Sequence, residues 1–150
     1  MVALLFLLFG AFSAFVEAVL YARRGAEAFA FNEHAVMTLQ RAAVVLLGPA
    51  ALLLLHWTDS AWYVACEAVP ALLLFPLVHD EAYNFTRLWI DYKANPLVPD
   101  NDAFGMARLK YTYGYQSPTT TARFDFTGRQ RTWLAILGLA AWVLAAYIFL

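Results

Sequence analysis

Four apolar stretches, each long enough to cross a lipid bilayer, constrain this chain more than any other feature of its sequence. They cover residues 2–22, 35–55, 61–79 and 131–150. A bilayer core about 30 Å thick needs roughly 20 helical residues, and each stretch comes close to that length. The expected fold is an all-α integral membrane protein, a single membrane domain over residues 1–150 with four transmembrane helices in an antiparallel bundle.

The composition agrees with a chain that hides its surface in lipid. Hydrophobic residues make up 63% of the sequence and charged residues 14%, against about 45–50% and 25% in soluble domains. A net charge of −1 leaves no basic surplus to neutralise phosphates, so nucleic acid is excluded as an expected partner. The lipid bilayer is the expected partner.

The basic residues indicate the orientation of the chain. Nine of the ten Lys and Arg residues follow the first or the third apolar stretch, and Arg41 lies two turns into the second stretch from the same side. Basic residues gather in cytoplasmic loops. We therefore expect a multi-pass protein of the cell membrane, with both termini outside and loops 23–34 and 80–130 in the cytoplasm.

The loop over 80–130 is too long to be a passive connector, so we expect it to have structure of its own. Its first part, "HDEAYNFTRLWIDYK" (79–93), has no helix breaker and places apolar residues at helical intervals. This pattern predicts that the third span continues as an amphipathic helix along the membrane interface. The following "NPLVPDND" (95–102) is expected to end that helix.

The second part of the same loop carries a different pattern. "LKYTYGYQ" (109–116) and "ARFDFTG" (122–128) both alternate with period two, on either side of the turn signal "SPTTT". Such a pattern predicts a small cytoplasmic β-hairpin. A disordered segment or a loop that lies on lipid is the alternative.

Well inside the apolar stretches, away from their ends, lie three ionisable residues, Glu17, Arg41 and Glu67, and each is by default a candidate for function. Glu17 and Arg41 lie at a similar depth, so the structural interpretation is a buried ion pair between them. In the functional interpretation, Arg41 binds an anionic head group or substrate and Glu17 is a base or a metal ligand. Glu67 lies nearer the outer face, and we expect it to be protonated and hydrogen-bonded to a neighbour such as Tyr147.

Two helical stripes bring further polar residues to the cytoplasmic end. His34, Thr38 and Arg41 share one face of the second span, and His79, Tyr83 and Arg87 share one face of the third. Arg41, Tyr83 and Arg87 are therefore the candidates for binding a substrate or an anion. Three spans contribute to the group expected at one membrane level: Glu17, His34, Arg41, His79 and Asp80.

Two imidazoles and two carboxylates are a ligand set that suits Zn²⁺, Fe²⁺ or Mn²⁺. The candidate metal ligands are His34, His79, Asp80 and Glu17, and the candidate catalytic residues are Glu17 and Asp80. No HExxH spacing supports the assignment. The alternatives are that both histidines are interfacial caps, that Asp80 caps a helix restarting after Pro76, or that the histidines bind a haem.

Three functions are compatible with these residues. The leading one is a non-enzymatic component of a membrane complex or homo-oligomer, with loop 80–130 as a docking surface for a protein partner. The first alternative is a membrane-embedded, metal-dependent enzyme that acts on a lipid or another amphiphile. The second is a pore or transporter subunit, for which close helix contacts are expected at the small residues of the fourth span, Gly138, Ala141 and Ala145.

Overall fold

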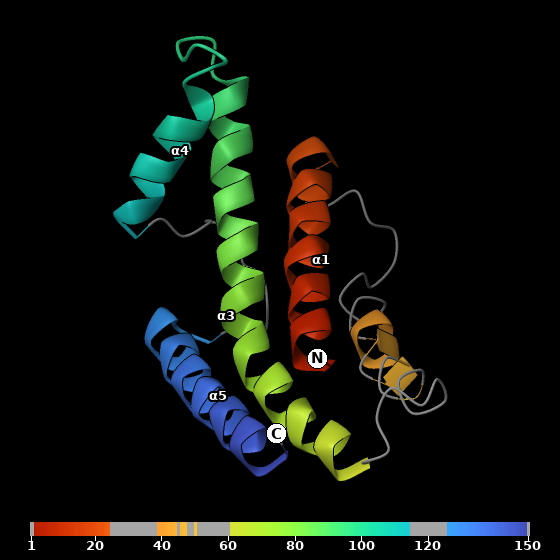
Figure 1. Ribbon diagram of the computed structural model, residues 1–150. Helices are drawn as coiled ribbons and strands as arrows, with labels where there is room; N and C mark the ends of the chain where they lie inside the picture. Colours follow the sequence, from red (N-terminus) through yellow and green to blue (C-terminus); the bar gives the residue numbers. More distant parts are fainter. Residues whose placement is uncertain are drawn as a thin grey trace. The chain divides into compact units, whose positions relative to one another are not determined.

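The regular elements of the protein are helices wherever its computed structural model describes the chain, which is at residues 2–24, 39–44, 46, 47, 50, 61–114 and 126–149. Residues 39–44, 46, 47 and 50 are helical. The longer elements are α1 (Val2–Arg24), α3 (Ala61–Ala94), α4 (Ala103–Thr112) and α5 (Gly128–Phe149) (Figure 1). The expected all-α class is confirmed for these parts of the chain.

Within the described residues, three helices are long and apolar enough to cross a membrane. The candidate spans are Ala3–Ala22 in α1, Trp62–Ala94 in α3 and Gly128–Phe149 in α5. They overlap the first, third and fourth spans expected from the sequence, and the one in α3 extends beyond the expected end at residue 79. Much of the expected second span, 35–55, and the whole turn "HWTDS" lie outside the described residues, so the four-helix bundle stays a prediction.

Helix α3 continues without a break through Pro70 and Pro76, over 34 residues. At about 1.5 Å per residue it is roughly 51 Å long, which exceeds the 30 Å of a bilayer core. The expected continuation of the third span to about residue 94 is confirmed, although its place at the membrane interface stays a prediction. Because the helix does not restart after Pro76, the alternative that Asp80 caps a new helix is wrong.

The first strand of the expected β-hairpin is wrong where the structure describes it. Residues 109–112 belong to α4, and residues 115–125 lie outside the described residues. The alternation that suggested a strand also places apolar residues at helical spacing. Phe104 and Tyr111, seven residues apart, both contact the ring of Phe85 on α3, at centroid distances of 5.4 and 5.6 Å. Packing of this face against α3 favours the helix over the strand.

The chain divides into two compact units, and each is described by itself. Unit 1 comprises Met1–Gly10, Phe29–Leu77 and Phe126–Leu150. Its core is formed by Ala3, Phe6 and Ala71. The apolar residues packed against this core come from α1, α3, α5 and the helical residues 39–44, and are Phe9, Val44, Phe75 and Trp142.

Unit 2 comprises Ala11–Ala28 and Val78–Asp125. Here α4 runs back along the C-terminal half of α3, as the green and teal helices of Figure 1 show. Trp89 contacts Phe104 at 5.6 Å, and Phe85 contacts Tyr111 near the other end of α4. The two helices therefore form an antiparallel helical hairpin, joined by the turns of residues 95–102.

Contacts within each unit give the relative directions of the helices. In unit 1, Ala3 meets Glu67 and Gly10 meets Phe75, so α1 and α3 run parallel there. In unit 2, Glu17 meets His79 and Tyr21 meets Tyr83, so the same two helices run parallel again.

Helix α5 runs the other way. In unit 1, Tyr63 meets Phe149 at the end of α5, whereas Gly138, eleven residues earlier, lies against Leu74. A Cβ added at Gly138 would lie 2.9 Å from Leu74 Cγ and 3.3 Å from Leu74 N, so the missing side chain lets the two helices approach closely. The small residue expected to bring helices together therefore acts inside the chain, in an antiparallel contact between α3 and α5.

Candidate functional site

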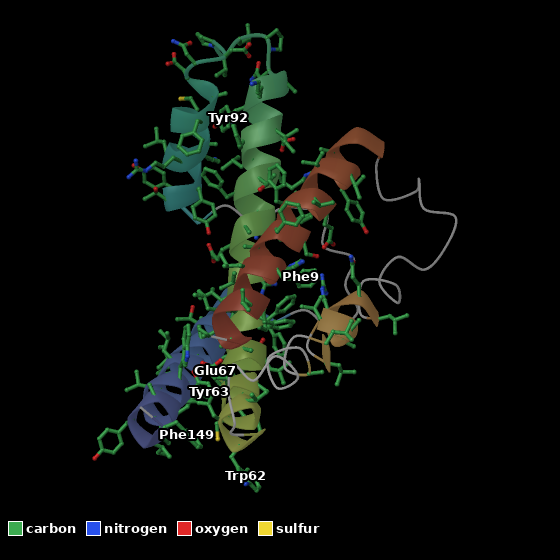
Figure 2. All side chains as sticks on the ribbon, turned by 45° about the vertical axis from the view of Figure 1, so that its right-hand side comes forward. Phe9, Trp62, Tyr63, Glu67, Tyr92 and Phe149 are labelled. Atoms are coloured by element: carbon green, nitrogen blue, oxygen red, sulfur yellow. The ribbon has the colours of Figure 1, made fainter. Side chains whose placement is uncertain are left out.

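The most deeply buried carboxylate of the described residues joins two helices in unit 1. Glu67 on α3 is 1% exposed. Its Oε1 accepts a hydrogen bond from the hydroxyl of Tyr63, one turn earlier, at 2.8 Å, and its Oε2 accepts one from the backbone N–H of Ala3 at 3.3 Å. Figure 2 shows Tyr63 and Glu67 beside Phe149 of α5.

This arrangement uses a side chain of one helix to cap another. The first N–H groups of a helix have no partner within the helix, and Ala3 is in the first turn of α1. A carboxylate at that end also interacts favourably with the helix dipole. Glu67 was expected to bond to Tyr147, but that side chain is 86% exposed, so this expectation is wrong and Tyr63 takes its place.

A second carboxylate joins the same two helices in unit 2. Glu17 Oε2 on α1 lies 3.1 Å from His79 Nε2 on α3, and both side chains are largely buried. One turn further along both helices, the rings of Tyr21 and Tyr83 meet edge to face at 6.4 Å. The pair is ionic when His79 is protonated, and the two contacts together form a short polar and aromatic seam between α1 and α3.

The seam continues on α3 with buried polar side chains. Asn84 is 3% exposed, and the Thr86 hydroxyl is satisfied by the carbonyl of Ala82 at 2.7 Å. Arg87 differs: its Nε and Nη1 atoms are buried and have no hydrogen-bond partner among the described residues. Buried donors without an acceptor are rare and call for an explanation such as a bound water or anion. The sequence made Arg87 a candidate for binding an anion, and it stays a candidate.

Arg41 lies in unit 1, where its guanidinium carbon is 5.1 Å from the centroid of the Phe75 ring. Such a cation–π contact compensates part of the cost of holding a charge away from water. The expected partner of Arg41, Glu17, belongs to unit 2. The Glu17–Arg41 ion pair therefore stays a prediction, beside the observed pair of Glu17 with His79.

The expected metal site is only partly within the described residues. Of its four candidate ligands, Glu17 and His79 are brought together, whereas His34 lies outside the described residues. In the part of the chain that the structure describes, no group of three His, Cys, Asp or Glu side chains is placed to hold a metal ion. The metal assignment, with Asp80 as a ligand, stays a prediction.

Several residues of these contacts were not expected from the sequence. Tyr63 and Tyr21 each lie four residues from a carboxylate inside a span, at Glu67 and Glu17. A hydroxyl one helical turn from a buried carboxylate is the signal that could have identified Tyr63. Arg131, counted only as a basic residue for orientation, is 6% exposed, and its spacing carries no signal for that burial.

The comparisons with known proteins add no assignment to this geometry. No family model matches the chain, and neither a curated protein nor a solved structure matches it. The functional argument therefore depends on the contacts described above.

Proposed function

We propose that this chain is a small polytopic membrane protein that works as a non-enzymatic component of a membrane complex or homo-oligomer. The observation that carries the proposal is the use made of the two carboxylates placed inside the apolar helices. Glu67 is bonded to Tyr63 and Ala3, and Glu17 is paired with His79. Both groups connect α1 to α3, which is the arrangement expected where polar residues fix helix positions.

The apolar surface supports an assembly role. Helix α5 uses its small residues against α3, and the side chains on its other face are exposed. That face has a shallow apolar hollow, lined by Leu139, Ala140, Val143, Leu144 and Tyr147. In a membrane, such a face contacts lipid chains or the helix of another subunit.

The proposal includes four spans. Parallel helices α1 and α3 that both cross a membrane must be connected by a segment that crosses back an odd number of times. The apolar stretch 35–55 is the part of the intervening chain with the necessary length. The antiparallel α3 and α5 need no further crossing between them, which agrees with a loop 80–130 on one side.

The proposed orientation places that loop and loop 23–34 in the cytoplasm, with both termini outside, because the basic residues gather there. The C-terminal part of α3, from about residue 80, then leaves the apolar core and continues through the interface. Labelling of single cysteines by a membrane-impermeant thiol reagent in intact cells tests this orientation. If the reagent labelled a cysteine at position 97 but not cysteines at the chain termini, the orientation would be the opposite of the one proposed.

Mass and metal content per chain test the assembly role. The protein is purified in a mild detergent, weighed by native mass spectrometry and analysed for metal by plasma mass spectrometry, beside a His34→Ala/His79→Ala variant. We expect masses of an oligomer or of a defined complex, and no stoichiometric metal. A metal bound near one per chain and lost in the variant, or a chain that is monomeric in lipid nanodiscs, would contradict the proposal.

The second candidate is a membrane-embedded enzyme, with or without a metal, that acts on an anionic lipid or amphiphile. The buried Nε and Nη1 of Arg87 favour it, because these donors suit an anionic group, about two helical turns beyond the Glu17–His79 pair on α3. The metal measurement above separates the metal-dependent form of this candidate from the first. Replacing Arg87 with Met then tests whether the arginine binds an anion: an unchanged thermal response to added anionic lipid would remove that argument.

A further inference from the structure

Helix α4 has two different faces. Ala103 and Ala107 are fully buried on the face that packs against α3. On the opposite face, Met106, Leu109 and Tyr113 are 40%, 55% and 80% exposed. Their spacing of three and four residues aligns Met106 and Leu109 along α4, and Tyr113, which directly follows the helix end at Thr112, continues the stripe. A row of exposed apolar side chains on a short helix indicates a surface that is covered in the protein's natural environment.

The charges of this segment are separated along its length. Arg108 and Lys110 are exposed near the C-terminal end of α4, and the helix contains no acidic residue. Asp100 and Asp102 lie at the other end, in and just after the turns that follow α3. The apolar stripe and the basic residues therefore share the C-terminal end of α4, whereas the acidic residues lie at the tip of the hairpin.

The antiparallel packing sets how far each end lies from the apolar core of the bilayer. The charged run that begins at His79 and Asp80 marks where α3 leaves that core. Phe85, which contacts Tyr111 of α4, is five residues or about 8 Å beyond Asp80. Ala94, the last residue of α3, is about 21 Å beyond it. Head-group layers are roughly 5–8 Å deep on each side, so the basic end of α4 reaches them and the acidic tip extends into water.

We propose that α4 is a membrane-surface anchor for an anionic leaflet. Met106, Leu109 and Tyr113 enter the head-group layer, and Arg108 and Lys110 bind lipid phosphates. This combination of an apolar face with basic residues is typical of helices that bind anionic membranes. The proposal depends on the membrane setting of the proposed function and is independent of its assembly role. A lipid leaflet is favoured over a protein because the charge complements it and α3 holds the stripe beside it.

Spin labels on the whole protein test the anchor. Cys66 is replaced by Ala, and a nitroxide is attached to a single cysteine at position 113, 97 or 143. Leu97 is an exposed apolar residue at the hairpin tip and serves as the matched control, while Val143 on α5 reports whether the chain has inserted. Collisions with oxygen, which concentrates in lipid, are compared with collisions with a water-soluble nickel chelate. Vesicles contain phosphatidylcholine alone or mixed with phosphatidylglycerol.

We expect oxygen to dominate at positions 143 and 113 and the nickel chelate to dominate at 97. In the anionic vesicles, Lys110→Gln should lower the ratio of membrane-bound to unbound α4 about fivefold. This change corresponds to roughly 1 kcal/mol for one basic residue at an anionic surface. Lys93→Gln, at the far end of α3, should leave the ratio unchanged.

Two results would overturn the anchor. A label at 113 that is as accessible to the nickel chelate as the label at 97, while 143 still reports lipid, places α4 in water. A label at 113 shielded from both reagents shows that protein covers the stripe. If position 143 also fails to report lipid, the membrane setting of the proposed function is wrong as well.

Discussion

Helices α1 and α3 are joined by different chemistry in the two units. In unit 1 their contact is apolar, with Phe6 against Phe75 at 5.2 Å, and the carboxylate of Glu67 closes the first turn of α1. In unit 2 the contact includes the Glu17–His79 pair and the edge-to-face rings of Tyr21 and Tyr83. The first kind of contact depends on shape and on a helix end, and the second on a polar pair that is ionic when His79 is protonated.

The difference between the two contacts predicts how much stability is lost when each one is removed. A buried carboxylate that accepts two hydrogen bonds leaves two donors unsatisfied when it is removed. The Glu17–His79 pair is a single contact whose side chains are 12% and 17% exposed, so removing it leaves fewer buried groups unsatisfied. We therefore expect substitutions in unit 1 to cost more than those in unit 2, and three experiments test that order.

The largest effect is expected at Glu67. Replacing it with Ala removes the acceptor of both the Tyr63 hydroxyl and the Ala3 N–H, and should lower the unfolding free energy by about 2–4 kcal/mol. Unfolding by sodium dodecyl sulfate in mixed micelles measures the change. Glu67→Gln, which keeps one acceptor oxygen, is the matched control and should lose less than half as much. Equal losses in the two variants would show that the acceptor oxygens do not hold α1 to α3.

A smaller loss is expected where α3 and α5 approach closely. Gly138→Ala places a methyl group 2.9 Å from Leu74 Cγ, with the Leu74 backbone nitrogen also near, and should destabilise the protein by about 1–3 kcal/mol. Gly105→Ala in α4 is the control, because nothing lies within 4 Å of its added Cβ. That change should be neutral or stabilise the protein by up to about 1 kcal/mol, since alanine favours helix. If both variants changed the stability of the protein in the same direction, that result would argue against the close contact between α3 and α5.

The smallest effect is expected for the pair in unit 2. A double-mutant cycle of Glu17→Gln and His79→Gln should give a coupling of about 1 kcal/mol, because the two groups lie within 3.1 Å. A second cycle combines His79→Gln with Asp91→Asn, whose exposed side chain is three turns further along α3. That cycle should show no coupling. If the double variant lost as much unfolding free energy as Glu17→Gln and His79→Gln lose separately, added together, the contact of these two residues would not stabilise unit 2.

The sequence predicted the helices better than their contacts. Span lengths follow from bilayer thickness, so α1 and α5 begin and end within a few residues of the apolar stretches, and α3 begins with one. The continuation of α3 to Ala94 was also predicted, because no breaker precedes Asn95 and Pro96. The strand expected at 109–112 was wrong because a short segment with aromatic residues fits both periods, and packing on α3 selected the helix.

The partners of the buried polar groups were harder to predict. Depth along a span places Glu17, Arg41 and His79 near one level, but it does not give the rotation of each helix about its axis. That rotation decides whether Glu17 faces a histidine or an arginine, and it depends on side-chain packing between helices. The capping of Ala3 by Glu67 has no local signal either, because the acceptor belongs to a different helix.

The cap on α1 also has a consequence for biosynthesis. The donor at Ala3 and the acceptor at Glu67 are 64 residues apart in the chain. At ribosomal speeds of about 5–20 residues per second, the acceptor is made roughly 3–13 s after the donor. During that interval the first turn of α1 must satisfy its N–H groups with water or with lipid head groups. Arrival of α3 then releases that end from its temporary partners, so completion of α1 in the bilayer waits for synthesis of α3.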